Sequence, residues 1–196
     1  MRGRLTRDRL VAQGIDCPEV YGDPALLLPL IYDKPVERHH TIGIVAHYMD
    51  EYDEKIKTFL ADNPDATLIS LTRYGHWRGV VDQIRSCEVV VSSSLHGLII
   101  ADAYGVRNAW MELSDKVEDR GFKFRDYFSS VGRDTSAPVD CTTSISREAI
   151  ERAAALWKPI SFDPAPLIKA CPFAIKESIV ARATAMPHIG NHAANQ

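Results

Sequence analysis

Short apolar runs alternate with longer amphipathic segments through residues 41–113, and this alternation limits the fold more than any other feature of the sequence. The short runs are rich in β-branched residues: Thr41–His47, Ala66–Leu71, Cys87–Ser92 and Asn108–Leu113. The segments between them have helical periodicity: Asp50–Ala61, Trp77–Ser86 and Leu95–Tyr104. Strands joined by helices of this length form βαβ units and a parallel sheet that is covered on both faces. The sequence therefore predicts an α/β, Rossmann-like fold with helices on both faces of a parallel sheet.

The flanking sequence is predicted to be helical. A short basic helix is expected at Arg4–Gln13. Three further helical stretches are expected in the C-terminal third: Phe122–Val131, Ser146–Trp157 and, with proline breaks, Phe162–Ala181. From Arg182 onwards periodic apolar residues give way to Ala, Asn, His and Gly, which is typical of a frayed terminus. We therefore predict one Rossmann-like domain over residues 1–181 and a disordered tail over residues 182–196.

Charge and hydropathy exclude several classes of protein. Lys and Arg total 23 against 26 for Asp and Glu, so the net charge is −3, without the basic excess of a general nucleic-acid-binding surface. The longest apolar run, Ala25–Tyr32, has eight residues and contains a proline, so it is too short to span a membrane. The basic start leads into polar residues rather than an apolar signal core. We expect a cytoplasmic protein that binds no nucleic acid.

The cysteines predict neither a metal site nor a disulfide framework. Cys17, Cys87, Cys141 and Cys171 are widely spaced, and no two of them form a C-x-x-C pair. Disulfides are rare in a cytoplasmic chain of this size. We expect all four to be plain thiols, buried or half-buried.

In a sheet of this class ligands bind beyond the carboxyl ends of the strands. The residues predicted to lie there are His47 and Tyr48, then Thr72–His76, then Ser92–Gly97. In the third group an apolar strand runs into three serines, which can cap the following helix and create an anion site at its N-terminus. His96 falls in the first helical turn, and Gly97 permits a close approach of backbone or ligand. A capped helix with a packed histidine explains the segment equally well.

Five stretches, in the correct order, resemble the polysaccharide pyruvyl transferase family. The most specific is SSSLHGLIIADAYGV at residues 92–106, which looks like the signature of that family. Residues 2–8 resemble the Arg-rich helix opening of the family, and residues 21–29 its Gly-Asp-Pro segment. Residues 123–132, and residues 162–164 with 170–173, resemble segments of members that act in exopolysaccharide synthesis, especially of the succinoglycan type. Many members carry Arg where this chain has Ser94. The resemblance covers residues 1 to about 175.

The resemblance implies transfer of pyruvate from phosphoenolpyruvate to two hydroxyls of one sugar, giving a cyclic ketal. It implies phosphoenolpyruvate and a lipid-linked or polymer sugar acceptor as partners, and no metal or organic cofactor. A lipid-linked acceptor would place the reaction at the inner face of the membrane. Family members resemble two-domain GT-B proteins, and this chain is expected to match the C-terminal half. We therefore also expect either a separate N-terminal half or a homodimer.

The resemblance and the strand-end positions together give the candidate site residues. We expect His96 to act as phosphate-binding donor or general acid and His47 as general base. The predicted donor-binding residues are Arg2, Arg73, Ser93, Ser94, Leu95, Gly97 and Lys123. Each also has a plain interpretation as a capping, loop or surface residue. His76 is expected to be a loop residue, Asp23 a turn or cap residue, and Trp77, Trp110 and Trp157 core residues.

Two other functions remain compatible with the sequence. One is the donor-binding half of a GT-B glycosyltransferase that uses a nucleotide-sugar. Such a site usually needs an acidic residue for the ribose; none stands near Leu95–Gly105 except Asp102, which is deep in the predicted helix. The other is a truncated, non-catalytic domain that depends on a separate first half.

Overall fold

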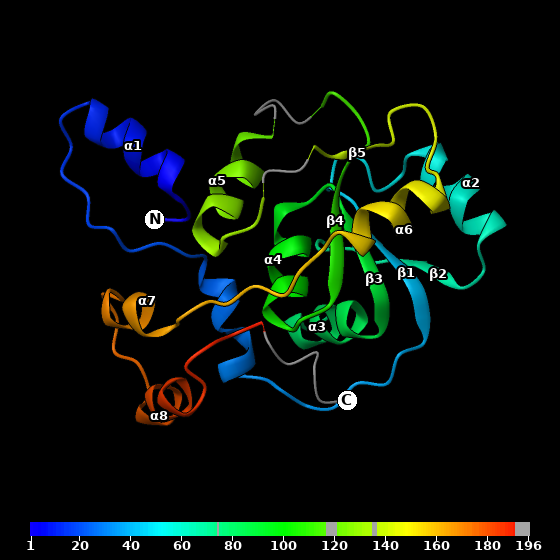
Figure 1. The fold of residues 1–196 in the computed structure, drawn as a ribbon. Coiled ribbons are helices and arrows are strands. Elements are labelled where there is room, and N and C mark those ends of the chain that lie inside the picture. Colours follow the sequence, from blue (N-terminus) through cyan, green and yellow to red (C-terminus); the bar gives the residue numbers. More distant parts are fainter. Residues whose placement is uncertain (74, 117–120, 135–136, 191–196) are drawn as a thin grey trace.

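The computed structural model describes residues 1–73, 75–116, 121–134 and 137–190 (Figure 1). At its centre lies a five-stranded parallel sheet with the strand order β2-β1-β3-β4-β5. The strands are β1 (His40–Val45), β2 (Ala66–Leu68), β3 (Cys87–Ser92), β4 (Arg107–Glu112) and β5 (Val139–Asp140). Helices surround this sheet, which confirms the predicted α/β, Rossmann-like fold.

The helices occupy nearly all the predicted positions. They are α1 (Arg4–Ala12), α2 (Glu54–Asp62), α3 (Trp77–Arg85), α4 (Leu95–Ala103), α5 (Phe122–Val131), α6 (Arg147–Ala155), α7 (Ala165–Lys169) and α8 (Glu177–Ala185). A 3₁₀ helix, η1 (Pro24–Leu30), and the two-residue strand β5 are additional to the predicted elements. Pro29 lies within η1 and has no backbone N–H, so the hydrogen-bond pattern of a regular α-helix is interrupted there.

The central strands β1, β3 and β4 bury residues on both of their faces, as a parallel sheet requires. In β1, Ile42 and Ile44 belong to one core cluster, which includes residues of α2 and α6. Val45 belongs to the other, which includes residues of α3, α4 and α5. Figure 1 shows α4 and α6 on opposite sides of the sheet. This two-sided burial accounts for the nearly continuous apolar character of the strand sequences.

The strand order places a topological switch point between β1 and β3. From β1 the chain crosses to β2 on one side, and from β3 it continues to β4 and β5 on the other. The two strands pair up to their carboxyl ends, where Val45 lies opposite Ser92. Chain segments leave the sheet in opposite directions at such a point, which is where sheets of this class bind their ligands.

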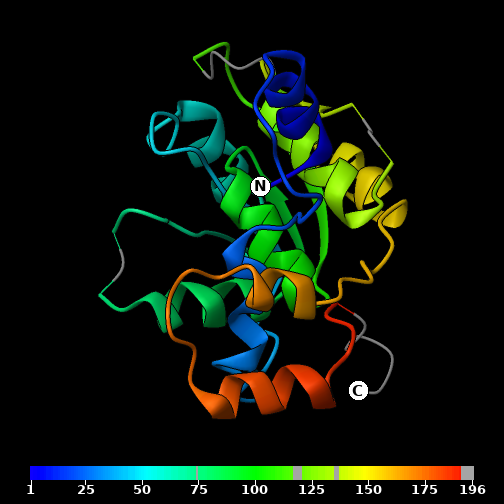
Figure 2. The same cartoon turned by 90° about the vertical axis from the view of Figure 1, so that its left-hand side faces the viewer.

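The C-terminal helices lie beside η1, as Figure 2 shows for the orange and red segments next to the blue one. Arg182 on α8 donates a hydrogen bond to the carbonyl of Leu30 (3.0 Å), and buried Ile189 forms an antiparallel bridge with Phe162. Residues 182–190 therefore differ from the disordered tail that we predicted, because isolated apolar residues such as Ile189 anchor them. Residues 191–196 lie outside the described residues.

All four cysteines are free thiols, as predicted. Cys87 and Cys141 are buried, and burial raises the pKa of each thiol to about 11. Cys17 and Cys171 are half-buried. Within the described ranges, no helix has the length and apolar character needed to cross a membrane.

Candidate functional site

The serines after β3 join the ends of two strands. The hydroxyl of Ser92 donates to the carbonyl of Val45 (2.9 Å) and accepts from the N–H of Ser94 (3.0 Å). The hydroxyl of Ser93 accepts from the N–H of His47 (2.9 Å). Ser94 is the N-cap residue of α4, but its side chain makes no capping bond. The predicted capping by serine side chains is therefore wrong: Ser92 and Ser93 bind strand and loop backbone instead.

Gly97 allows α4 to lie directly against β1. A Cβ atom at Gly97 would come within 2.8 Å of Cγ1 of Val45 and still closer to the hydroxyl of Ser92. The N–H of Gly97 donates to the carbonyl of Ser94 (3.1 Å), so this predicted donor is already engaged. The side chain of Leu95 is buried in the core and is therefore not available to a ligand. By helix geometry, the N–H groups of Leu95 and His96 have no acceptor within α4.

Three residues from distant parts of the sequence meet at the N-terminus of α4. Nε2 of His96 lies 3.7 Å from Oδ2 of Asp23, and Nε of Arg2 lies 3.4 Å from the same oxygen. Asp23 is 7% exposed, whereas the side chain of His96 is 55% exposed. A buried carboxylate thus holds an exposed imidazole and a partly exposed guanidinium, and we call Arg2, Asp23 and His96 the strand-end trio.

Asp23 also caps η1. Its Oδ1 accepts from the N–H of Ala25 (3.0 Å), which is the role predicted for an aspartate before a proline. Its other oxygen is left to face Arg2 and His96. Sequence reasoning favoured the cap and so missed Asp23 as a site residue. The Gly-Asp-Pro segment was the available signal.

The loop after β1 contains a second buried carboxylate, Glu51. Its Oε1 accepts hydrogen bonds from the hydroxyls of Ser70 (2.7 Å) and Thr72 (3.2 Å), in the segment after β2. Its Oε2 lies 3.5 Å from Nη2 of Arg73, whose guanidinium sits 4.8 Å from the centre of the Tyr52 ring. The predicted donor-binding residue Arg73 is therefore held by Glu51, which the sequence did not single out.

Asp50 is a third buried carboxylate at the strand ends. Its Oδ1 accepts from the hydroxyl of Ser114 (2.9 Å) and lies 3.5 Å from Nζ of Lys116. Its Oδ2 is buried and has no hydrogen-bond partner among the described residues. Asp50, Ser93 and Trp110 line the same small cavity. Nothing in the sequence marked Asp50, because an acidic loop residue is ordinarily expected in solvent.

The remaining predicted residues are more scattered. His47 follows β1, and its ring centre lies 4.5 Å from that of Tyr48. Lys123 is the second residue of α5, with its ammonium 5.5 Å from the centre of the Phe124 ring. His76 caps α3 by accepting from the N–H of Arg78 (3.1 Å).

The tryptophans pack largely as predicted. Trp110 is buried and stacks on Phe124, with ring centres 4.6 Å apart. Trp77 is partly buried against the core, with its ring 5.6 Å from that of Tyr32. Trp157 is half-buried and also donates a hydrogen bond to Asp102 (2.8 Å).

Comparison with known proteins identifies the family. Residues 1–115, more than half of the chain, match the family model described as polysaccharide pyruvyl transferase. The chain belongs to the polysaccharide pyruvyl transferase family. The match includes the whole strand-end trio and also His47, Asp50, Glu51 and Arg73, but not Lys123.

Two curated relatives match parts of this family member. It is 32% identical over 136 residues to uncharacterized protein L143 of Acanthamoeba polyphaga mimivirus, which covers 67% of this chain and 47% of that protein. It is 31% identical over 83 residues to the succinoglycan biosynthesis protein ExoV of Rhizobium meliloti (strain 1021), covering 42% of this chain and 25% of that protein. The chain therefore spans half the length or less of these relatives. No solved structure matches the chain.

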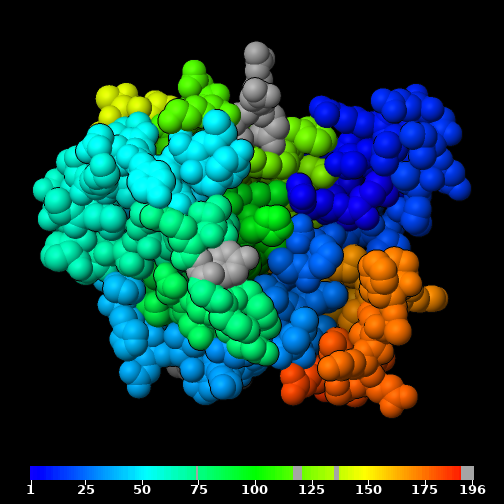
Figure 3. Space-filling view, turned by 180° about the vertical axis from the view of Figure 1, so that it is seen from behind, coloured from blue at the N-terminus to red at the C-terminus, as the bar shows by residue number. Residues whose placement is uncertain are grey.

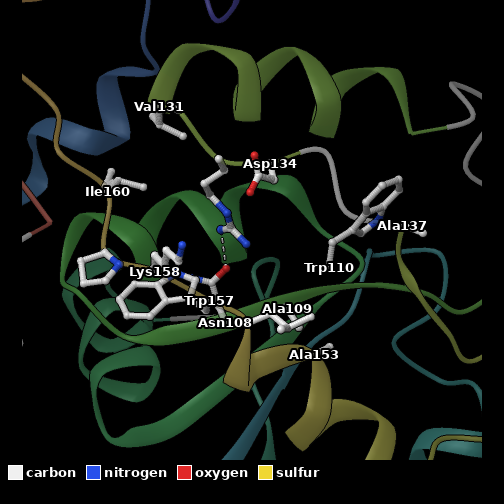
Figure 4. A pocket seen from close by; sticks show the side chains of 14 residues that line it. Asn108, Ala109, Trp110, Val131, Asp134, Ala137, Ala153, Trp157, Lys158 and Ile160 are labelled. Carbon is white, nitrogen blue, oxygen red and sulfur yellow. Dashed lines mark hydrogen bonds between the residues drawn. The ribbon is translucent and has the colours of Figure 1, made fainter.

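A further cavity, of about 390 Å³, lies at the edge of β4 between α5 and α6 (Figure 4). Nearby polar groups converge on the fully buried carboxylate of Asp102, which accepts from Asn108 (2.7 Å), Tyr127 (2.9 Å), Arg133 (2.8 Å) and Trp157 (2.8 Å). Both oxygens of Asp102 are thus occupied within the protein. We assign this cluster to the fold, because the carboxylate has its partners without a ligand.

Proposed function

We propose that this chain carries the donor site of a ketal pyruvyltransferase, which moves pyruvate from phosphoenolpyruvate to two hydroxyls of one sugar. The observation that carries the proposal is the meeting of Arg2 and His96 on Asp23 at the N-terminus of α4. All three residues fall in the part of the chain that matches the family model. Their place beside the β1/β3 switch point is where a sheet of this order binds ligands.

Phosphoenolpyruvate carries a phosphate and a carboxylate, so its site needs positive charge and N–H donors. Arg2 supplies a permanent cation, and the imidazole of His96 supplies a further hydrogen-bond donor. The N–H groups of Leu95 and His96, with the dipole of α4, add donors suited to a phosphate. Lys123 is a further cation for the donor, and Ser94 lies at the same helix end.

The proposed chemistry needs an acid at carbon three and a base at the sugar. His96 gives its proton to carbon three of phosphoenolpyruvate, and a sugar hydroxyl adds to carbon two as His47 takes the hydroxyl proton. The second hydroxyl then attacks carbon two, the bond to the phosphate oxygen breaks, and phosphate leaves with the remaining proton. Asp23 orients the imidazole of His96 through the contact between its Oδ2 and Nε2 of the ring. The scheme uses no metal and no organic cofactor.

Calorimetric titration of the purified chain with phosphoenolpyruvate tests the proposal. We expect saturable binding that weakens about tenfold or more in His96→Ala and in Arg2→Ala, since each removes a hydrogen-bond donor to the anionic ligand. His188→Ala and Arg107→Ala are matched controls, because both residues are exposed and lie outside the strand-end trio. Binding of UDP-glucose instead of phosphoenolpyruvate would favour a glycosyltransferase. Absence of phosphoenolpyruvate binding, or equal binding by all variants, would contradict the proposed donor site.

A further inference from the structure

The loop of residues 48–52 reverses the usual distribution of polar and apolar side chains. Tyr48, Met49 and Tyr52 are 63%, 47% and 65% exposed, whereas Asp50 and Glu51 are 1% and 5% exposed. Large apolar side chains are normally buried and isolated carboxylates are normally exposed. The loop therefore exposes the rings of Tyr48 and Tyr52 while it buries the carboxylates of Asp50 and Glu51.

The buried carboxylates anchor this loop to the segments that follow two other strands. Glu51 binds Ser70 and Thr72 after β2, and Asp50 binds Ser114 after β4. The loop itself follows β1, so the carboxyl ends of three strands are linked through it. Tyr48 and Tyr52 are thus presented from an anchored backbone, which lowers the entropy lost when they bind a ligand.

Each tyrosine ring is supported by a neighbouring side chain. The ring of His47 lies 4.5 Å from that of Tyr48, at an angle of 39°. The guanidinium of Arg73 lies 4.8 Å from the centre of the Tyr52 ring, while Glu51 holds it from another direction. Both rings nevertheless remain more than half exposed, so they retain surface for a ligand.

The loop adjoins the proposed donor site. His47 precedes Tyr48 and is bonded through its N–H to Ser93, three residues before His96. Figure 3 shows the cyan segment that follows β1 and the dark blue N-terminal segment on the same face of the molecule, with green atoms between them. A second substrate must lie beside the donor for the two to react.

We propose that Tyr48 and Tyr52, together with Arg73, form a platform that binds a pyranose ring of the sugar acceptor. This inference rests on the proposed function for its substrate class. Aromatic faces pack against the C–H groups of a sugar ring, and the guanidinium of Arg73 can donate to its hydroxyls. The apolar patch consists of the side chains of Tyr48, Met49 and Tyr52. A stable protein interface buries roughly 800 Å² per partner, or about 20–30 residues a side, so this patch is too small for one. A polar ligand with one apolar face fits this combination.

Saturation-transfer NMR with a panel of gluco-, galacto- and manno-oligosaccharides tests the platform. We expect transfer from the chain to the ring protons of at least one saccharide, and its loss in the double variant Tyr48→Ala/Tyr52→Ala. The double variant Tyr48→Phe/Tyr52→Phe keeps the ring faces and should keep most of the signal. Phe173→Ala is the matched control, because Phe173 is an aromatic side chain with 78% exposure elsewhere on the chain. Circular dichroism should show the same thermal midpoint for all of these proteins, because the mutated rings are largely exposed.

A titration of the same variants with phosphoenolpyruvate separates this inference from the proposed function. Donor binding that persists in Tyr48→Ala/Tyr52→Ala while saccharide binding disappears supports both. If the chain binds phosphoenolpyruvate but shows no saturation transfer to any saccharide of the panel, the platform is overturned and the donor site is retained. The reason is that all sugars of the panel share the ring face that the platform would bind. Saccharide binding that is unaffected by the double variant also overturns it. The platform would also be overturned if the chain self-associates and Tyr48→Ala/Tyr52→Ala abolishes this association, because the two rings would then form a contact between copies.

Discussion

Asp102 lies in the last turn of α4 and Asp23 lies beside the N-terminus of the same helix; both are buried carboxylates, yet their surroundings differ. Asp102 accepts hydrogen bonds from four side chains at 2.7–2.9 Å, and Arg133, its cationic partner, is itself largely covered. Asp23 has one capping bond and two cations at 3.4 and 3.7 Å, which remain partly open to solvent. The complete set of short hydrogen bonds around Asp102 belongs to the fold, whereas the incomplete set around Asp23 lies at the proposed donor site.

The ionisation of Tyr127 reflects the closed character of the Asp102 cluster. Burial, and then the nearby negative charge of Asp102, raise the pKa of Tyr127 well above its usual value of 10. The phenol therefore remains a hydrogen-bond donor to Asp102 at every pH at which the protein would be handled.

The largest effect is expected when the closed cluster is broken. Asp102→Ala leaves Arg133 buried without its counter-ion and removes the acceptor for Tyr127 and Trp157, so unfolding free energy should fall by about 3–5 kcal/mol. Urea denaturation followed by circular dichroism measures this change. A loss of unfolding free energy below about 1 kcal/mol would show that Asp102 does not organise the fold, and would contradict the contrast between Asp102 and Asp23.

A smaller loss is expected at the contact between α4 and β1. Gly97→Ala places a Cβ atom within 2.8 Å of Val45, and this overpacking should cost about 1–3 kcal/mol of unfolding free energy. Gly79→Ala in α3 is the matched control: a Cβ there meets nothing within 4 Å, so we expect about 0.5–1 kcal/mol of stabilisation. Equal behaviour of the two variants in urea denaturation would contradict the close packing described for Gly97.

Asp23 should affect binding more than stability. Asn is also a good N-cap residue, so Asp23→Asn should change unfolding free energy by less than about 1 kcal/mol. We expect its affinity for phosphoenolpyruvate to fall about tenfold, because Arg2 and His96 lose the carboxylate that positions them. Calorimetry measures the affinity. A rise in affinity would mean that Asp23 merely repels the anionic donor, contrary to the positioning role.

The smallest effect is expected for the reactivity of the two buried thiols, Cys87 and Cys141, which take part only in core packing. With their pKa raised to about 11, Cys87 and Cys141 are almost entirely thiols at neutral pH and should not react with Ellman's reagent in the folded chain. Half-buried Cys17 and Cys171 should react first, and the other two only in denaturant. Mass spectrometry of the modified peptides identifies the sites. Early labelling of Cys87 would show that the sheet opens more readily than its packing suggests.

The sequence predicts the sheet well because its strands carry strong local signals. Runs such as Cys87–Ser92 carry consecutive β-branched residues, and they are short enough to exclude a helix. The weaker elements were not predicted: β5 has two residues, and η1 contains a proline that an α-helix would reject. Ile189 is a single apolar residue in a polar stretch, so its burial against the domain left no periodic pattern to read.

The site could be predicted only in part. His96 and Arg2 were identified through their motifs, but their common contact with Asp23 depends on a fold that brings the N-terminus to α4. Asp50 and Glu51 stand between exposed aromatic residues in a loop, where local sequence favours exposed acids. Burial in a loop is set by partners far along the chain, such as Ser114, and no spacing rule predicts it.

The most direct test of the contrast between the two regions is NMR of the backbone amides during titration with phosphoenolpyruvate. We expect the largest shifts at Leu95 and His96 and around Asp23, with Asn108 and Arg133 almost unchanged. Shifts centred on Asn108 and Arg133 would instead place the ligand in the cavity beside β4. That result would contradict the assignment of the strand-end trio as the donor site.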